Sequence, residues 1–426
     1  MKVRAIFGPP GTGKTRKLVE IAKHAADHQA RGILYLSYTK AAAEEAVSRI
    51  KDPAIKPSTL HSFAFNALGM NRAAVVDSKK LAEFGKVMGV PFKGSEPGSD
   101  ELQEGDEYAS VLEYANNRII EPMAAYDTFG RPGTAHRFEF FVKSYLEWKQ
   151  TYGYMDFDDM LTMFMRSPMT GKAAEVVILD EAQDCTPLQW QAFIRICDNA
   201  KHVFIAGDDD QAIYEWSGAN PHGMIEFAEV NEGETRVLDQ SYRVPRCVHA
   251  LVHSDILPQM RQRVDKKFGH TDKEGSITRY GDIWDVNMQK FDNSGGGMVL
   301  VRDRFRMKEV EKMLNREMIP YDVTGGVSPW TGKYAKAIRA GEKVDIPLWW
   351  RDFYKQADLT RPVKIVLSTI HQAKGRESHR VLLDLQLTGK ALAAMAMNAD
   401  SELRVLYVGL TRTSNELILT GDSPLL

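Results

Sequence analysis

The segment Gly8-Pro-Pro-Gly-Thr-Gly-Lys14-Thr15 limits what this chain can fold into more than any other feature of the sequence. A glycine-rich loop of this spacing cradles a phosphate only when a strand leads into it and a helix begins at its end, because the helix N-terminus supplies unpaired N–H groups. Val3 to Phe7 is an apolar run typical of a buried strand, and the residues after Thr15 place apolar side chains at helical spacing. The segment therefore predicts a nucleotide phosphate site.

Within this site, Lys14 is expected to neutralise the β- and γ-phosphates, and the hydroxyl of Thr15 is expected to be a ligand for Mg²⁺. The predicted nucleotide-binding residues of the loop are Gly8, Pro9, Pro10, Gly11, Thr12, Gly13, Lys14, Thr15 and Arg16. An ordinary glycine-rich turn is the alternative, but it needs neither the preceding strand nor the following helix.

Two later apolar runs end in polar residues that complete such a site. Val176 to Leu179 leads into Asp180, which is placed to reach Mg²⁺, and Glu181, which is placed to orient or deprotonate the attacking water. The run Val203 to Ala206 leads into a segment whose Gln211 is placed to sense the γ-phosphate. These residues predict a nucleoside triphosphatase.

Two aromatic residues follow Gln211 closely. Tyr214 and Trp216 offer ring faces on which unpaired bases stack, at about 1–3 kcal/mol per base. Packing in a hydrophobic core is the alternative for each ring. The hypothesis favoured here is that this stretch links the state of the nucleotide to the grip on a nucleic-acid strand.

The order of apolar runs predicts an α/β fold with two doubly wound parallel sheets, because parallel neighbours need a crossover helix between them. Strands are expected at Val3–Phe7, Gly32–Leu36, Val176–Leu179 and Val203–Ala206, and then at Met298–Val301, Ile365–Ser368, Val381–Leu385 and Leu417–Leu419. A helix is expected at Met307–Glu317. The stretch 65–171 has helical periodicity, no strand-like run and a polar loop at Gly94 to Gly105, which predicts a helical insertion in the first domain.

Composition excludes several other classes of protein. The 426 residues include 55 basic and 57 acidic side chains, a net charge of −2, so a nucleic-acid surface has to be a local groove. Three cysteines without metal-ligand spacing argue against a disulfide scaffold or a zinc fold. No apolar stretch is long enough to cross a membrane. We expect a soluble cytoplasmic protein, located in the host cytoplasm if the source is a virus.

The motifs, taken in order, resemble those of UvrD/Rep/PcrA-type superfamily 1A DNA helicases. Ser37-Tyr38-Thr39-Lys40 is similar to the second motif of that family, and Thr59-Leu-His61-Ser-Phe63 to the next. Asp156-Phe-Asp-Asp159 resembles the segment that precedes the Mg²⁺-binding strand in the family. Ala182-Gln-Asp184, directly after Asp180 and Glu181, continues the signature of that strand. In relatives the motifs that correspond to Ser37–Lys40 and Thr59–Phe63 line the path of the DNA strand. The resemblance therefore implies DNA contacts by Tyr38, Thr39, His61 and Phe63, in addition to Tyr214 and Trp216.

The second half of the chain carries further motifs of the family. Leu238-Asp-Gln-Ser-Tyr242-Arg243 implies a tyrosine stacked on the base and an arginine at the γ-phosphate. The segment from Ser368 to Glu377 implies DNA contacts by Thr369 and His371 and a nucleotide contact by Glu377, and the last motif ends in Arg412, a second candidate arginine finger. An arginine supplied to a phosphoryl-transfer site is worth about 10³–10⁵ in rate. A surface salt bridge is the alternative for each arginine.

The resemblance implies four structural parts. These are a RecA-like ATP-binding domain at 1–64 and 172–235, a helical insert at 65–171, a second RecA-like domain at 236–326 and 363–426, and a much reduced insert at 327–362. ATP would bind between the two α/β domains, and closure of the cleft would be converted into 3′→5′ steps along one strand. The expected partners are single-stranded DNA, tailed duplex DNA and proteins of replication or repair, and the expected state is a monomer.

The sequence departs from the family at three places. We expect the segment before the phosphate loop, whose Gln reads adenine in relatives, to be absent, which predicts weaker selectivity for ATP. The usual Asn-Lys of the second motif is replaced by Lys40-Ala41. The reduced insert contains Trp330, Trp349, Trp350, Phe353 and Tyr354, for which packing is preferred over stacking on DNA.

The basic stretch Arg261 to Lys267 is interpreted as a solvated loop rather than a phosphate-binding segment.

Three functional hypotheses remain open. The leading one is a DNA-dependent ATPase that translocates on single-stranded DNA and unwinds duplexes. The second is an ATP-gated DNA-binding or remodelling accessory protein with little unwinding of its own, which the small subdomains favour. The third is an RNA-directed enzyme of the same superfamily.

Overall fold

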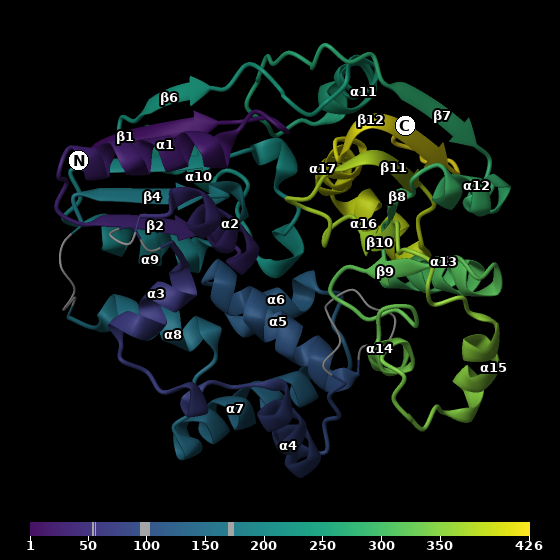
Figure 1. Cartoon of the computed structure of the whole chain (residues 1–426). Coiled ribbons are helices and arrows are strands. Elements are labelled where there is room, and N and C mark those ends of the chain that lie inside the picture. Colours follow the sequence, from purple (N-terminus) through teal and green to yellow (C-terminus); the bar gives the residue numbers. More distant parts are fainter. Residues whose placement is uncertain (53–54, 56, 94–102, 169–173) are drawn as a thin grey trace. The chain divides into compact units, whose positions relative to one another are not determined.

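A computed structural model describes residues 1–426 except 53–54, 56, 94–102 and 169–173 (Figure 1). The chain forms two compact units. The first contains Met1–Asp239 and Val264–Phe268, and the second contains Gln240–Arg263 and Gly269–Leu426. The chain therefore returns to the first unit for one short segment before the second unit is completed. Both units are built on parallel sheets with surrounding helices, which confirms the predicted fold of two RecA-like α/β domains.

The sheet of the first unit has the order β3-β2-β4-β5-β1-β6, and all its strands are parallel. Its strands are β1 (Lys2–Phe7), β2 (Ile33–Ser37), β3 (Ser58–Thr59), β4 (Val176–Asp180), β5 (His202–Gly207) and β6 (Glu234–Val237). The four strands predicted for this domain are confirmed. The two edge strands were not predicted, because β3 has only two residues and β6 has a largely exposed, polar sequence.

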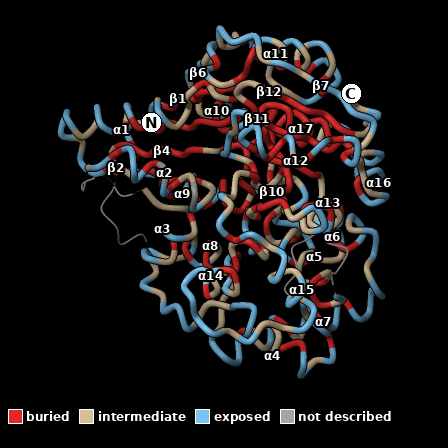
Figure 2. The backbone as a smooth tube through the Cα atoms, turned by 45° about the vertical axis from the view of Figure 1, so that its right-hand side comes forward, coloured by how far each residue is buried: buried red, intermediate tan, exposed pale blue. Residues whose placement is uncertain are grey.

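Alternation along the central strands sends side chains to two separate hydrophobic cores, as the two-residue period of a strand requires. Ile178 of β4 packs with helices α1 (Lys14–Asp27) and α2 (Lys40–Ile50) on one face. Its neighbours Val177 and Leu179 pack with helices on the other face. Those helices are α3 (Leu60–Ala67), α8 (Phe157–Arg166), α9 (Pro187–Cys197) and α10 (Gly223–Val230). Figure 2 shows the result as buried central strands, and β4 is buried at every residue.

The described part of residues 65–171 contains helices and no strand, as predicted. Besides α8 these are α4 (Ser78–Met88), α5 (Glu104–Arg118), α6 (Pro122–Thr128) and α7 (Ala135–Tyr152). They share a core of their own in which Phe84, Tyr108 and Phe141 are buried. Most of the predicted polar loop at Gly94 to Gly105 lies outside the described residues, and its last two residues begin α5.

The sheet of the second unit has the order β7-β12-β11-β8-β10-β9, again with parallel pairing. Its strands are β7 (Ser276–Tyr280), β8 (Gly297–Val301), β9 (Tyr321–Val323), β10 (Ile365–Thr369), β11 (Ser378–Asp384) and β12 (Thr413–Thr420). Its helices are α11 (Arg246–Leu251), α12 (Met288–Asn293), α13 (Arg304–Arg316), α14 (Lys333–Arg339), α15 (Leu348–Gln356), α16 (Gly389–Met397) and α17 (Ala399–Leu410). The four predicted strands and the helix predicted at Met307–Glu317 are confirmed, whereas β7 and β9 were not predicted.

The aromatic residues of 327–362 divide into packed and exposed rings. Trp330 is fully buried in the core of the second unit, and the ring of Phe353 meets it edge-on with the ring centroids 5.3 Å apart. The Tyr354 hydroxyl donates to the Pro329 carbonyl over 2.8 Å. Packing is therefore confirmed for these three residues. It is wrong for Trp349, which is 79% exposed on α15.

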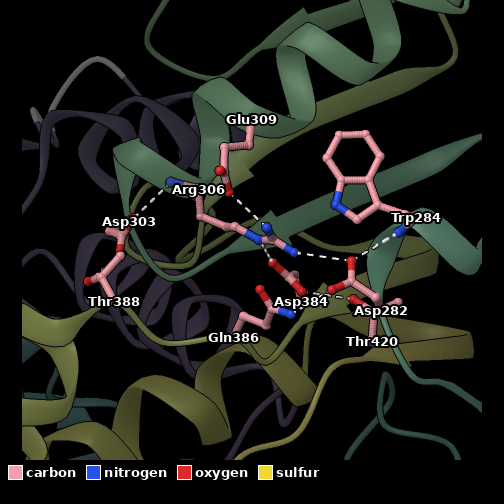
Figure 3. A network of polar contacts seen from close by, with 9 residues as sticks. All are labelled: Asp282, Trp284, Asp303, Arg306, Glu309, Asp384, Gln386, Thr388 and Thr420. Carbon is pink, nitrogen blue, oxygen red and sulfur yellow. Dashed lines mark hydrogen bonds and ion pairs between the residues drawn. The ribbon is translucent and has the colours of Figure 1, made fainter.

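A charged network closes the carboxyl edge of the second sheet (Figure 3). Arg306 of α13 donates through Nε to Asp384 Oδ2 at the end of β11 over 2.5 Å, and through Nη1 to Glu309 over 2.8 Å. Asp384 also accepts from the Thr420 hydroxyl of β12 over 3.0 Å, and Nη2 of Arg306 lies 3.5 Å from Asp282, which follows β7. The side chain of Asp384 is completely buried, so its carboxylate depends on Arg306.

We expect Arg306→Met to lower the free energy of unfolding of the second unit by about 3–5 kcal/mol, because it leaves the buried carboxylate of Asp384 without its cation. Arg351→Met is the matched control, since Arg351 pairs with Asp345 where both side chains are solvent-exposed. Urea unfolding followed by tryptophan fluorescence measures both variants. Equal midpoints for the two variants would show that the network contributes nothing specific.

Candidate functional site

The glycine-rich loop connects β1 to α1, as the sequence predicts. Gly11 and Gly13 have φ of 72° and 81°, a left-handed conformation that favours glycine, and Gly13 is the N-cap of α1. A Cβ on Gly8 would lie 2.1 Å from Cγ of Lys14, so a larger residue there would displace the lysine side chain. Lys14 folds back over the loop and donates through Nζ to the Gly8 carbonyl over 2.7 Å. The loop thus holds its lysine close to the backbone that is predicted to wrap the phosphates.

Thr15 and Asp180, the two predicted metal ligands, lie side by side. The Thr15 hydroxyl donates to Asp180 Oδ2 over 2.8 Å, and the Tyr35 hydroxyl of β2 donates to the same oxygen over 2.9 Å. Asp180 is fully buried at the end of β4. Burial and the negative charge of Glu181 raise the pKa of Asp180 to about 6, against the opposing effect of these two hydrogen bonds.

Glu181 has a left-handed backbone with φ of 56°, which is unusual for a residue other than glycine and is a strain found mainly at functional sites. Gln183 Nε2 donates to Glu181 Oε2 over 2.6 Å, and Gln183 Oε1 accepts from the backbone N–H of Asp208 over 3.0 Å. Gln183 therefore connects the end of β4 to the end of β5. Sequence reasoning did not select it as a site residue, although its place two residues after Glu181 was a usable signal.

The residue Gln211 lies almost fully buried beside the end of β5. Its Nε2 donates to Asp208 Oδ2 over 2.6 Å. Lys266, from the short segment that returns to the first unit, forms ion pairs with Asp208 at 3.1 Å and with Asp210 at 3.0 Å, and it also pairs with Asp209. The interpretation of 261–267 as a solvated loop is wrong for Lys266, because three carboxylates draw its side chain into the protein.

Three aromatic residues, one after the end of β2 and two in the segment after β5, lie close together. The ring centroids of Tyr38 and Tyr214 are 5.6 Å apart, and those of Tyr214 and Trp216 are 6.3 Å apart. Trp216 is 43% exposed, and burial together with the charge of Asp184 raises the pKa of Tyr38. Thr39 caps α2 by accepting from the Ala42 N–H. The two predicted stacking residues, Tyr214 and Trp216, are thus brought together with the predicted DNA contact Tyr38.

The other predicted DNA contacts of the first unit lie on α3. Burial lowers the pKa of His61 to about 4, so this imidazole is neutral at pH 7, and its ring meets that of Phe157 edge-on at 5.5 Å. Phe63 packs against the hydrophobic core, with its ring edge-on to Phe164 at 5.8 Å.

In the second unit, Arg243 and Glu377 are brought together: Arg243 Nε donates to Glu377 Oε2 over 2.5 Å. Tyr242 beside them is 75% exposed. Arg412 is 1% exposed and donates to the carbonyls of Val408 and Arg376 over 2.9 and 3.3 Å, so a surface salt bridge is excluded for it.

The two remaining candidates of the second unit, Thr369 and His371, lie at and just after the end of β10. Thr369 accepts from the Gln372 N–H over 3.3 Å. Among the described residues, no helix has the length and apolar character that a membrane span needs, and no three side chains of His, Cys, Asp or Glu form a metal-binding group.

Comparison with known proteins adds a family to this geometry. The profile of the UvrD/REP helicase N-terminal domain matches residues 2–231, which is more than half of the chain. The "Probable DNA helicase" of Mycoplasma pneumoniae is 21% identical over 99% of this chain and 81% of that protein.

Two further relatives match over shorter stretches. The "Putative ATP-dependent DNA helicase YjcD" of Bacillus subtilis is 24% identical over 76% of this chain and 47% of that protein. The "Probable DNA helicase II homolog" of Rickettsia felis is 26% identical over 41% and 30%, respectively. The chain therefore spans less than half the length of these two relatives.

We expect Asp180→Asn to stabilise the protein at neutral pH. The folded-state pKa of about 6 lies above the ordinary value, so the stability that Asp180 contributes is present below about pH 4 and is lost as the pH rises through 6. The variant should gain on the parent protein between pH 4 and 7, by at most about 3 kcal/mol.

Urea unfolding at the two ends of this pH range measures the gain. The control is Asp77→Asn, because the backbone N–H of Lys80 lowers the pKa of Asp77 and the effect of pH should have the opposite sign. A difference between Asp180→Asn and the parent that does not change with pH would contradict the raised pKa.

Proposed function

Because the chain belongs to the UvrD/REP helicase family, we propose that it is an ATP-dependent single-stranded-DNA translocase and 3′→5′ DNA helicase. The observation that carries the proposal is one hydrogen-bonded set at the carboxyl edge of the first sheet. Thr15 bonds Asp180, Gln183 joins Glu181 to Asp208, and Asp208 holds Gln211. The proposed base and sensor are thus linked through Gln183 and Asp208, and the proposed metal ligands Thr15 and Asp180 lie directly beside them in the chain or the fold, which supports a site for hydrolysis of a nucleoside triphosphate.

The chemistry assigned to these residues follows from their surroundings. Hydroxyl and carboxylate oxygens are the donors that Mg²⁺ prefers, so the adjoining Thr15 and Asp180 fit this ion, which would neutralise charge on the phosphate oxygens when bound. Lys14 adds a fixed positive charge at the loop. Glu181, held by Gln183, takes the proton of the attacking water. Gln211 contacts the γ-phosphate and reports its loss to the segment that follows.

Coupling to DNA rests on the distance along the chain between sensor and stacking residues. Gln211 and Tyr214 are three residues apart, and the ring of Tyr214 lies near those of both Tyr38 and Trp216. A small movement of Gln211 therefore reaches this row of rings, on which unpaired bases stack without regard to sequence. We assign the row to single-stranded DNA, with Thr39, His61 and Phe63 on the same path and Thr369 and His371 on the second unit.

The proposed 3′→5′ polarity of translocation and the proposed reduction of the second insert are both supported by resemblance to the family. Residues 327–362 contain only α14 and α15 as regular elements, in keeping with a compact motor that lacks a large second insert. We propose single-stranded and tailed duplex DNA as substrates, a monomer as the working form, and replication or repair proteins as partners. An accessory protein would hydrolyse ATP and bind DNA but unwind little of it. An RNA-directed enzyme of the same superfamily would prefer an RNA strand.

We expect Glu181→Gln to lower the DNA-stimulated kcat for ATP hydrolysis by about 10²–10⁴-fold, because the carboxylate that accepts the proton is replaced by an amide. Glu175→Gln is the matched control, since Glu175 lies just before the other end of β4 and pairs with Lys201. Steady-state hydrolysis with and without single-stranded DNA measures both variants.

Strand displacement on 3′-tailed and 5′-tailed DNA and RNA duplexes then separates the hypotheses. Stimulated hydrolysis with unwinding of only the 3′-tailed DNA supports the proposal. Hydrolysis without unwinding favours the accessory protein, and an RNA preference favours the third hypothesis. A parent protein that is folded and hydrolyses no ATP would contradict the ATPase itself.

We also expect Arg243 and Arg412 to differ when each is replaced by alanine. Arg243→Ala should lower kcat by about 10³-fold or more and lower the melting temperature by less than Arg412→Ala does, because this residue is proposed to contact the γ-phosphate and its ion pair is with the exposed Glu377. Arg412→Ala should lower the melting temperature, because its guanidinium is buried against backbone carbonyls. Thermal unfolding and ATP hydrolysis measure both, with Arg246→Ala as the exposed control. Normal kcat in Arg243→Ala would remove it from the site.

A further inference from the structure

Lys266 occupies an unusual position for a lysine. Its side chain has no solvent exposure, and it is surrounded by the consecutive residues Asp208, Asp209 and Asp210. The backbone N–H of Val264 donates to Asp209 Oδ2 over 2.7 Å, so the segment is also anchored through its main chain. Burial by itself lowers the pKa of Lys266, but the three carboxylates outweigh burial and raise it. The ammonium is therefore charged throughout the neutral range.

The three carboxylates need this cation. Three consecutive buried negative charges repel one another in a medium of low polarity, and a buried charge without a partner is strongly unfavourable. The conformation of residues 208–210 is therefore conditional on Lys266. Its ammonium also lies 6.0 Å from the ring centre of Phe7, the residue that precedes the phosphate loop.

A continuous path of hydrogen bonds leads from Lys266 to the catalytic groups of the proposed function. Asp208 forms an ion pair with Lys266 through Oδ1 and accepts a hydrogen bond from Gln211 on Oδ2. The backbone N–H of Asp208 donates to Gln183, which in turn donates to Glu181. Lys266 is thus connected to Gln211 through one residue, Asp208. It is connected to Glu181 through two residues, Asp208 and Gln183.

The origin of the segment adds a second observation. Residues Val264–Phe268 belong to the first unit, whereas the residues immediately before and after them belong to the second. Lys266 is accordingly the buried anchor of a strap whose two ends are continuous with the second unit. A displacement of those ends pulls on the strap, because the covalent backbone between them has a fixed length.

We propose that Lys266 is a positioning residue that holds Gln211 and Glu181 in place for hydrolysis, and that its strap transmits displacement of the second unit's chain to them. The inference rests on the proposed function and deepens it, since it names a regulator of the same site outside its sequence motifs. Lys266 acts through Asp208 and Gln183 and does not contact the nucleotide.

The test compares Lys266→Met with Lys267→Met, the same substitution at the exposed neighbouring residue. The first readout is hydrogen–deuterium exchange of the amides of 207–213 in the protein without nucleotide. We expect faster exchange in Lys266→Met alone, because the hydrogen bonds of Asp208 and Gln211 lose their support. This readout does not depend on activity, so it decides the positioning role even if the parent protein hydrolyses no ATP and the proposed function fails.

The second readout is ATP hydrolysis. Lys266→Met should lower kcat about tenfold or more with KM within about twofold of the parent value, since misplacement of catalytic groups affects turnover rather than binding. In a double-mutant cycle, adding Lys266→Met to Gln211→Ala should reduce kcat by much less than it does in the parent protein. A purely structural role predicts effects that multiply.

Unchanged exchange and unchanged kcat in folded Lys266→Met, or fully multiplicative effects in the cycle, would overturn the proposal. If Lys266→Met does not fold, Asp210→Asn carries the same comparison, because it removes one of the three charges that face Lys266 and leaves the other two pairs in place. Its exchange over 207–213 must then exceed that of Lys267→Met, and equal exchange would overturn the proposal.

Discussion

Concentration of negative charge at one edge of the first sheet is the constraint to which the rest of the site responds. Asp180 is buried at the end of β4, Asp208 to Asp210 are buried after β5, and Glu181 lies between them in the chain. Such a group of acids is stable only if protons, cations or hydrogen-bond donors offset it. Thr15 and Tyr35 donate to Asp180, Gln183 donates to Glu181, and Lys266 neutralises the aspartates. What is left of the negative charge suits a divalent cation.

The second unit solves the same problem with its own residues. Its sheet also ends in a buried carboxylate, Asp384, but Arg306 of α13 binds it permanently and Thr420 completes its hydrogen bonds. Both sheets are six-stranded and parallel, but they differ in strand order and in the chemistry of their carboxyl edges. A protein side chain occupies the edge of the second sheet, whereas the first has a glycine-rich loop and a carboxylate whose pKa is about 6. Fold alone would not have assigned the nucleotide to one of them.

The buried aspartates also explain why the DNA-contact candidates and the nucleotide candidates belong together. Residues 208–211 hold the sensor, and the chain continues directly into Tyr214 and Trp216. In the proposed function, the support of Gln211 on one side and the aromatic rings that follow it on the other would carry a change at the phosphate to those rings. The proposed strap of Val264–Phe268, whose two ends continue into the second unit, is anchored on these residues through Lys266.

Local pattern was sufficient wherever a residue's environment is set by its near neighbours in sequence. The phosphate loop, the eight central strands, the helix at 304–316 and the pairing of Thr15 with Asp180 were all predictable, because buried strands read as apolar runs and glycine spacing reads as a loop. Edge strands such as β6 and β7 were missed, since an exposed strand has no apolar signature.

Tertiary structure decided what depends on groups far apart in sequence. Lys266 looks like one of several basic residues in a solvated loop until Asp208, more than fifty residues earlier, is placed beside it. Arg412 proves to be buried against its own backbone, and Trp349 is exposed while Trp330 is packed. Sequence by itself determined the fold class and predicted the phosphate site. The tertiary structure alone determined which charges are buried together, because the free energy of a charge depends on every group that surrounds it.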